Sequence, residues 1–482
     1  MSFFLGIDVG STSITSVIIE MKSHSVVKST SIKNSCEVTS YLDKKIGRSE
    51  WDMEKMFGLV IKNTANLIKE TNLPLTAIGV TGQQQGLQLL DQKFKTVGNF
   101  ISWQDQRSKE LLPNNKQSYL ELMGEIGGAK NKKDGLPSFE NTGCPIVTGY
   151  TVPILFWLMK NSELGKNLYG TTAPEYVVSK LTEEKPVTDP TDAASWGVYD
   201  IKNNDWNFDL IDSLGINRSI FSEIKKSCTV AGRLDNKIAK ILGTQTGVPV
   251  SIASGDHQCS FAGTVADYKN TIAINVGTGG QSTVYLEKII PRGWLEIRPF
   301  IESGYLLAGV GVVGGRTFRV LKDFFLNSIT SINSTEIDSD SIYTNLVKLA
   351  STVPKGSEGV IFDPLFTGSR KKPSAKGAVY GLTPSTFTIG HLTRALFEAI
   401  AEQLLISYEE AINLGAGKRN ILVGSGNGIK LNQILKESLE SKFQMKMNIG
   451  KNDEEAAIGA ALCAAVAEGS FKSISEASKY FV

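Results

Sequence analysis

The chain has 482 residues, of which 41% are hydrophobic and 21% are charged, and its formal net charge is +2. This balance is typical of a globular protein and gives no reason to expect a nucleic acid or an anionic membrane as a partner. Since single cores stop growing at roughly 250–300 residues, the length predicts two domains, which we place at residues 1–250 and 251–482.

The cysteines and the N-terminal segment indicate the compartment. Five scattered cysteines form no C-x-x-C pair, which favours reduced thiols over a zinc site or a disulfide framework. The N-terminus lacks the basic and long apolar regions of a signal peptide, and no stretch is apolar enough to span a bilayer. We therefore expect a cytoplasmic protein. With only three histidines, any metal would be a hard cation on oxygen ligands.

The first predicted element is a β-hairpin over residues 3–20, whose turn carries Gly10, Ser11, Thr12 and Ser13. Glycine permits the close approach of an oxyanion, and successive backbone N–H groups form an anion nest. The turn is therefore a candidate phosphate site, although an ordinary hairpin turn would show the same pattern. Asp8 precedes the turn, where its carboxylate could hold Mg²⁺ through water or simply cap the turn.

Two polar loops follow a predicted helix at 51–71 and a strand at 73–82. The first loop contains Gln84 and Gln85, and the second contains Trp103 and Asp105. Amides, an acid and an apolar ring suit a polyhydroxylated ligand. A core tryptophan and an ion pair would explain the second loop equally well. The polar segment after it, residues 108–137, is expected to be partly mobile.

Asp256 follows an apolar strand at 248–253 and opens a helix. An acid just beyond a strand end points into a crevice, so Asp256 is the candidate base for an attacking hydroxyl. The alternative is a helix N-cap. A nucleophilic role for His257 and Cys259 is disfavoured, because helix residues two apart do not face each other.

A second hairpin over residues 271–287 repeats the first, with Gly277, Thr278 and Gly279 in its turn. This is a long-period duplication with one copy in each half, and it is not a solenoid repeat. Two such turns on facing domains could hold a polyphosphate from both sides. Asn275 stands where the first copy has Asp8, so we expect only the first half to carry the metal.

The last third predicts helices at 389–411 and 454–467, and the second of these is rich in small residues and should pack closely on a neighbour. Between them a glycine-rich loop, Gly424 to Asn427, follows a strand and could lie against adenine. Strands alternating with helices predict an α/β protein. There is no G-x-x-x-x-G-K-[ST] sequence, which excludes a P-loop.

Taken together and in this order, these motifs resemble the FGGY carbohydrate kinase family of the actin/hexokinase-like superfamily. The resemblance implies two ribonuclease-H-like α/β domains with ATP and Mg²⁺ in an interdomain cleft. It implies Asp8 near the metal and Asp256 as the base. The nucleotide contacts it implies are Gly10, Ser11, Thr12, Ser13, Gly277, Thr278, Gly279, Gly424, Ser425, Gly426 and Asn427.

Within that family, the segments 102–107, 141–144 and 192–197 look most like sedoheptulokinases, with xylulokinases next. This resemblance implies phosphorylation of a ketose, sedoheptulose to sedoheptulose 7-phosphate, by a monomer or homodimer. The implied sugar contacts are Gln84, Gln85, Trp103, Asp105, Asp192 and Asp256.

Two positions depart from the family pattern. Gln84-Gln85 stands where those two groups usually have Met-His, and Ser369 stands where the family usually has Glu. Two rival functions remain: a nucleotide-gated interaction protein, which needs no sugar loops, and a non-catalytic sugar sensor. The first is separated from a kinase by whether ATP consumption requires added sugar, and the second would bind sugar tightly without turning any over.

Overall fold

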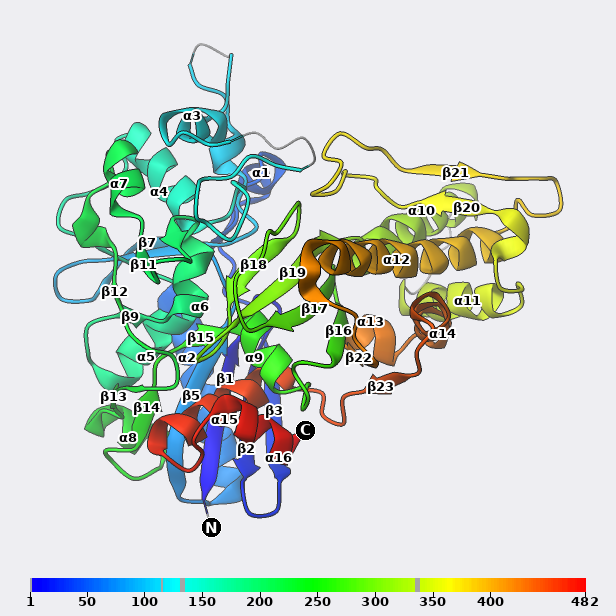
Figure 1. Cartoon of the computed structure of the whole chain (residues 1–482). Helices are drawn as coiled ribbons and strands as arrows, with labels where there is room; N and C mark the ends of the chain where they lie inside the picture. Colours follow the sequence, from blue (N-terminus) through cyan, green and yellow to red (C-terminus); the bar gives the residue numbers. More distant parts are fainter. Residues whose placement is uncertain (1, 114–115, 131–134, 334–338) are drawn as a thin grey trace.

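The computed structural model describes residues 2–113, 116–130, 135–333 and 339–482. Its first large sheet has the strand order β13-β14-β5-β1-β2-β3, and β15 also pairs with β5 (Figure 1). These strands are β1 Phe3–Val9, β2 Ser13–Glu20, β3 Ser25–Lys33, β5 Leu75–Gly82, β13 Val230–Arg233, β14 Pro249–Ser251 and β15 Ser254–Gly255.

The second large sheet has the order β18-β19-β17-β16-β22-β23. Its strands are β16 Thr271–Val276, β17 Gly280–Leu286, β18 Glu296–Pro299, β19 Tyr305–Val312, β22 Ile421–Ser425 and β23 Met447–Ile449. Both predicted hairpins are confirmed, since β1 pairs antiparallel with β2 and β16 pairs antiparallel with β17.

The two sheets have the same internal connectivity. In the first, β3, β2 and β1 run antiparallel to one another and β1 then pairs parallel with β5. In the second, β19, β17 and β16 are antiparallel and β16 pairs parallel with β22. The duplication read from the hairpins therefore extends to five strands of each sheet, β3-β2-β1-β5-β14 and β19-β17-β16-β22-β23, in agreement with the predicted ribonuclease-H-like fold.

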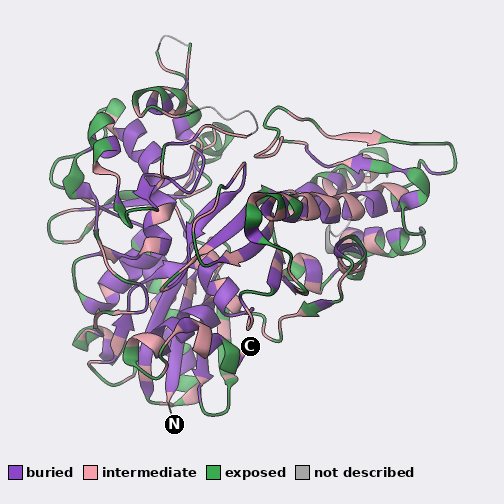
Figure 2. Ribbon diagram, in the orientation of Figure 1, coloured by how far each residue is buried: buried purple, intermediate pink, exposed green. Residues whose placement is uncertain are grey.

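Alternating side chains of β1 enter two different cores. Leu5, Ile7 and Val9 pack with the helices α2 (Met53–Thr71) and α5 (Ala173–Thr182), while Phe4 packs on the other face with α15 (Glu455–Glu468). This is the two-residue period of a strand buried on both faces. Figure 2 shows the central strands of this sheet buried, whereas the edge strand β3 has no buried residue.

The C-terminal helices lie against the sheet of the first half. α15 packs on β1, β5 and α9 (Asp256–Ala262), and α16 (Ile474–Phe481) joins the same core. Figure 1 shows α15 in red across the blue strands. The predicted close packing is confirmed, because a Cβ on Gly459 would fall well under 3.0 Å from the Cys259 carbonyl oxygen. The predicted boundary between two domains at residue 250 is not tested by this packing and stays a prediction.

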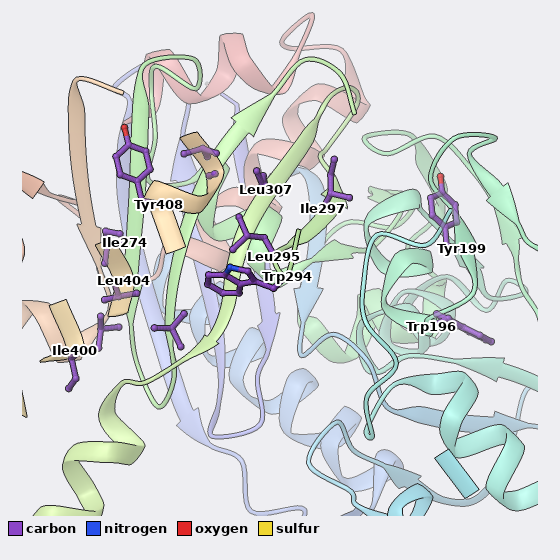
Figure 3. Close-up of a cluster of buried hydrophobic side chains, with 14 of the residues drawn as sticks. Trp196, Tyr199, Ile274, Trp294, Leu295, Ile297, Leu307, Ile400, Leu404 and Tyr408 are labelled. Carbon is purple, nitrogen blue, oxygen red and sulfur yellow. The ribbon is translucent and has the colours of Figure 1, made fainter. Parts of the chain in front are cut away.

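The second sheet buries one face against α12 (Ile389–Ala411). Ile274 of β16 lies in the same cluster as Ile400 and Leu404 of this helix (Figure 3). The opposite face carries polar residues, including Asn275 and Thr283, and is turned toward α9. A sheet that is apolar on one face and polar on the other leaves its polar face available for a ligand.

Smaller elements complete the structure. The other helices are α1 Tyr41–Lys45, α3 Tyr119–Ile126, α4 Thr151–Lys160, α6 Pro190–Ala193, α7 Phe208–Ser213, α8 Asn236–Leu242, α10 Gly315–Asn333, α11 Ser339–Ser351, α13 Asn427–Lys430 and α14 Gln433–Phe443. The other strands are β4 Glu50–Trp51, β6 Leu87–Leu90, β7 Thr96–Ile101, β8 Tyr169–Thr171, β9 Val187–Thr188, β10 Tyr199–Asp200, β11 Asp205–Trp206, β12 Glu223–Ile224, β20 Ile361–Asp363 and β21 Ala378–Tyr380.

The segment 108–137, predicted to be partly mobile, contains α3, and residues 114–115 and 131–134 of it lie outside the described residues. No helix in the described part of the chain has the length and apolarity needed to cross a membrane.

Candidate functional site

Three strands of the first sheet bring acidic and polar residues to one edge. Asp8 of β1 is paired with Thr81 of β5, and Thr81 is paired in turn with Ser254 of β15. The Thr81 hydroxyl donates to the Ser254 carbonyl at 2.6 Å, which holds the short strand β15 in place. Since these strands are parallel, their carboxyl ends meet, and Asp256 follows directly as the first residue of α9.

The carboxylates at this edge perturb one another. Burial, together with the charges of Asp256 and Glu454, raises the pKa of Asp8 to about 7. Burial also raises the pKa of Asp256 to about 6, against the lowering effects of the His257 backbone N–H and the Arg298 guanidinium. Like charges brought together in a cleft favour the arrival of a cation.

A cavity of about 150 Å³, which we call the cleft cavity, lies between α9 and the polar face of the second sheet. It is lined by Asp256 from the first sheet's edge and by Asn275 and Ser425 from the second sheet. The Asn275 side-chain amide donates to the Ser425 hydroxyl at 2.8 Å. Three motifs far apart in the sequence therefore border one cavity.

Both glycine-containing turns lie at the carboxyl ends of their strands. Thr12 is exposed in the first turn, and Gly277, Thr278 and Gly279 are exposed in the second. The second turn is anchored through its carbonyl oxygens, because Gly315 N–H donates to Gly277 at 3.0 Å. The Gly277 N–H donates within the turn, to the Gly279 carbonyl at 3.0 Å.

A second, narrower cavity of about 10 Å³, which we call the polar pocket, lies beside the first. Its lining residues include Gln84, Gln85, Tyr150, Thr191, Ser195 and Arg298. The Gln84 amide donates to the Thr191 carbonyl at 3.0 Å, and Gln85 N–H donates to the Ser195 hydroxyl at 3.2 Å. A sugar is larger than this volume, so its entry requires the walls to move apart.

Asp192, at the end of α6, is a fully buried acid whose two carboxyl oxygens find no hydrogen-bond partner among the described residues. Burial and the nearby charges of Glu175, Asp189 and Asp256 raise its pKa well above the usual range. A buried polar group without a partner is costly unless a ligand completes it. Asp192 lines none of the three cavities, so a bound molecule could reach it only if the surrounding side chains moved.

The second polar loop, which contains Trp103 and Asp105, does not border the polar pocket. The Asp105 carboxylate is fully buried and accepts four hydrogen bonds, all within 3.0 Å. The donors are Ser49 N–H, the backbone N–H of Arg107, and Nε and Nη2 of the Arg107 guanidinium. Neither Asp105 nor the half-buried Trp103 lines the polar pocket. A contact of Asp105 with a sugar, which stays a prediction, would require one of these bonds to be released.

The sequence analysis missed a buried charged group behind the polar pocket, of which Arg298 lines the pocket itself. The buried carboxylate of Glu296 pairs with Arg298 at 2.7 Å and with Arg370 at 2.7 Å. Burial alone would raise the pKa of Glu296, but the two guanidinium groups hold it at about 2. The sequence pattern that could have indicated this group is the alternation of charged and apolar residues in the strand Glu296–Pro299.

The surroundings of His257 and Cys259 give neither side chain a nucleophilic role. Burial, helped by Arg298, lowers the pKa of His257 to about 3, so its ring is neutral and its Nε2 lies 2.9 Å from the Thr283 hydroxyl. Cys259 is fully buried, and burial raises its pKa well above the usual range. A protonated, inaccessible thiol is unreactive.

The donors near Asp8 fit a magnesium ion. No group of three or more His, Cys, Asp or Glu side chains within the described ranges is arranged to hold a metal by itself. Mg²⁺ does not need such a group of three side chains, because it keeps several waters and takes only one or two carboxylates in addition to substrate phosphates. Burial and the charges of two neighbouring acids raise the pKa of Asp8 to about 7. A bound cation would offset this repulsion and favour the ionised carboxylate.

The departure at Ser369 also has a local explanation. Ser369 closes a turn in which its hydroxyl accepts from Lys372 N–H at 3.0 Å and its own N–H donates to the Lys372 carbonyl at 3.0 Å. The turn presents Arg370 to Glu296.

Two sheets of the same connectivity, with an acidic edge and two glycine-containing turns between them, define a protein of the actin/hexokinase-like class. The N-terminal domain model of the FGGY family of carbohydrate kinases matches residues 3–263, and the C-terminal domain model matches residues 301–468. The chain belongs to this family, and it is therefore an ATP-dependent carbohydrate kinase that phosphorylates an alcohol group.

Individual relatives are distant and act on different sugars. A xylulose kinase of Staphylococcus xylosus is 26% identical, over 100% of this chain and 94% of its own length. A sedoheptulokinase of Mus musculus is 24% identical, over 95% and 96%. The crystal structure of a gluconate kinase from Lactobacillus acidophilus superposes with a TM-score of 0.82 at 23% identity, covering 99% of this chain and 92% of that one. The last likeness shows the fold alone.

Proposed function

We propose that this chain transfers the γ-phosphate of ATP to a hydroxyl of a ketose, with sedoheptulose as the first candidate and xylulose as the alternative. The observation that carries the proposal is the position of Asp256, which borders the cleft cavity with Asn275 and lies close enough to Asp8 to raise its pKa. An acid that borders this cavity can accept a proton from a hydroxyl group bound there.

In this mechanism Asp256 orients the attacking hydroxyl and takes its proton as the new O–P bond forms. The bond between the γ-phosphorus and the bridging oxygen breaks at the same time, and ADP leaves. The residues of the turns at 10–13 and 277–279 bind the phosphates, and those at 424–427 bind the adenosine. Asp8 would hold Mg²⁺, which supplies charge neutralisation to the phosphates when bound.

For the sugar we propose Gln84, Gln85 and Asp192 as contacts. Support comes from the polar pocket, which Gln84 and Gln85 line, and from the unpartnered buried acid Asp192 near Asp256. Asp192 also lies outside that lining and is proposed for its unpartnered oxygens. Trp103 and Asp105 remain predictions of lesser support, because neither lines the pocket and the Asp105 carboxylate already accepts four hydrogen bonds. The cytoplasmic location of the enzyme remains a prediction, and so does its oligomeric state of monomer or homodimer.

A coupled assay of ADP release tests the proposal across sedoheptulose, xylulose, ribulose, gluconate and glycerol. The expected result is ADP release that requires added sugar, with sedoheptulose or xylulose giving the highest kcat/KM. Sugar-independent ATP consumption would favour the nucleotide-gated interaction protein. Tight sugar binding without any turnover would favour the non-catalytic sensor.

The pH dependence of turnover should follow Asp256. Since burial raises its pKa to about 6, we expect kcat/KM to fall as the pH drops through about 6, because the base becomes protonated. The same shift has the opposite effect on stability: the raised folded-state pKa stabilises the folded chain at low pH, and this contribution is lost as the pH rises through about 6. Loss of activity without a lower melting temperature between pH 7 and 5.5 is the result to look for, and a flat rate profile would contradict it.

Asp8→Asn should weaken the response to magnesium. The substitution removes the carboxylate nearest the proposed ion, so we expect the Mg²⁺ concentration for half-maximal activity to rise by roughly tenfold or more. Asp453→Asn is the matched control, since this exposed acid pairs with Lys430 on the surface. Identical magnesium titrations for Asp8→Asn and wild type would remove Asp8 from the metal site.

A further inference from the structure

The polar pocket is bordered by one guanidinium edge that has no strong partner. Arg298 lies on β18 and is about nine-tenths buried. Its Nε and Nη2 donate to Glu296 Oε2 at 3.0 and 2.7 Å. Its Nη1 lies 3.3 Å from Gln84 Oε1 and 3.4 Å from His257 Nδ1. Both separations exceed the usual 2.7–3.2 Å range for such bonds, so Nη1 is weakly bound.

Glu296 fixes the position of Arg298 Nη1 by binding the other two nitrogens of the guanidinium. Glu296 holds the guanidinium with two bonds in the fork geometry that fixes an arginine plane. The other oxygen of Glu296 pairs with Arg370, so two guanidinium groups share one carboxylate. This wall therefore carries an excess of positive charge, and Arg298 can only donate hydrogen bonds.

Acidic acceptors lie near this wall, since Asp256 borders the cleft cavity together with His257, whose Nδ1 is 3.4 Å from Arg298 Nη1. Asp256 and the unpartnered Asp192 are acids that can receive hydrogen bonds from hydroxyl groups. A ligand that satisfies both kinds of group places hydroxyls toward the two acids and a strong acceptor oxygen toward Arg298. A carbonyl or carboxylate oxygen meets this requirement better than a hydroxyl, because hydrogen bonds from a charged donor gain most with an electron-rich acceptor.

We propose that Arg298 Nη1 binds an sp² oxygen of the sugar, displacing Gln84 and His257, so that the enzyme selects open-chain ketoses or sugar acids over plain polyols. This inference rests on the proposed kinase function and assigns Arg298 as a substrate-binding residue for it. Ketoses and sugar acids share the recognised chemistry, and the experiment below separates them.

The test compares sugars that differ only at this oxygen. Values of kcat/KM are measured for xylulose against xylitol and for gluconate against glucitol, in wild type and in Arg298→Gln. In wild type we expect at least one sp² sugar to exceed its alcohol by about 10- to 100-fold, the range for a hydrogen bond to a charged group. Arg298→Gln should lose most of that ratio, mainly through a higher KM for the sp² sugar, and which pair responds identifies the source of the oxygen.

Controls keep the result interpretable. Arg298→Lys retains the charge without the fork and should keep an intermediate ratio, which also covers a Gln variant that fails to fold. Lys376→Gln, an exposed residue outside both cavities, should leave the ratio unchanged. Equal turnover of sugar and alcohol by wild type, or equal losses on both in the Arg298 variants, would overturn the inference while leaving the kinase function intact. If no sugar is turned over, the proposed function fails, and calorimetric binding of the same pairs still decides the role of Arg298.

Discussion

Asp256→Asn should fold and bind ATP but lose about three decades of kcat. The amide keeps the size of the side chain and removes the only feature that the mechanism needs, a lone pair able to take the proton. Losing a general base and its positioning together is expected to cost about this much. The measurement is steady-state turnover of the best sugar in the coupled assay, with nucleotide affinity followed by calorimetry.

The stability of this variant distinguishes chemistry from folding. Burial raises the pKa of Asp256, which means that the ionised carboxylate is disfavoured in the folded chain at neutral pH. Replacing it with a neutral amide should leave the melting temperature equal or higher. Turnover within tenfold of wild type would exclude Asp256 as the base, and a lost fold would leave Asp256→Ala and Asp256→Glu to decide the point.

Gly6→Ala should lower the free energy of unfolding by about 3 kcal/mol, the upper part of the range for overpacked cores. Gly6 lies on the face of β1 that meets α15, and a Cβ there would fall well under 3.0 Å from the Ala457 carbonyl oxygen. That atom is helix backbone, so relief requires α15 to move away from the sheet. The measurement is denaturant unfolding, and kinase activity should fall as well because Asp8 lies two residues along the strand.

Gly58→Ala is the matched control. Gly58 lies within α2, and a Cβ at this position meets no atom within 4 Å. Alanine in a helix interior is favoured over glycine by roughly 0.5–1 kcal/mol, so this variant should be equally or slightly more stable. Similar unfolding curves for the two variants would show that α15 does not pack against β1 as closely as the structure indicates.

The local pattern was sufficient wherever one short segment decided the outcome. The hairpins at 3–20 and 271–287, the helices at 389–411 and 454–467 and the helix opened by Asp256 all appear as expected. The helix predicted from Trp51 begins at Met53, because Trp51 pairs in β4 and Asp52 caps the helix. The short helix α13 within the loop 424–428 was not foreseen, since glycines there gave no helical signal.

The candidate site was predicted in part for the same reason. Asp8, Asp256 and the two turns could be found because each stands at a strand end, where the sequence shows both the strand and its termination. Glu296, Arg298 and Arg370 could not be assigned in this way. Their role depends on which buried charges meet, and the pair of Glu296 with Arg370 joins β18 to a loop more than 70 residues away.

By itself, the sequence determined the strand and helix types, the duplication of the hairpin and the order of the family's motifs, because hydrophobic periodicity and glycine placement are local properties. The tertiary structure alone decided that α15 returns to the first sheet, that the Asp105–Arg107 pair is buried, that Asp192 has no hydrogen-bond partner among the described residues, and that Arg298 lines the polar pocket. These outcomes depend on packing and on the pairing of buried charges between distant segments. No local pattern encodes the cost of burying a charge until its neighbours in space are known.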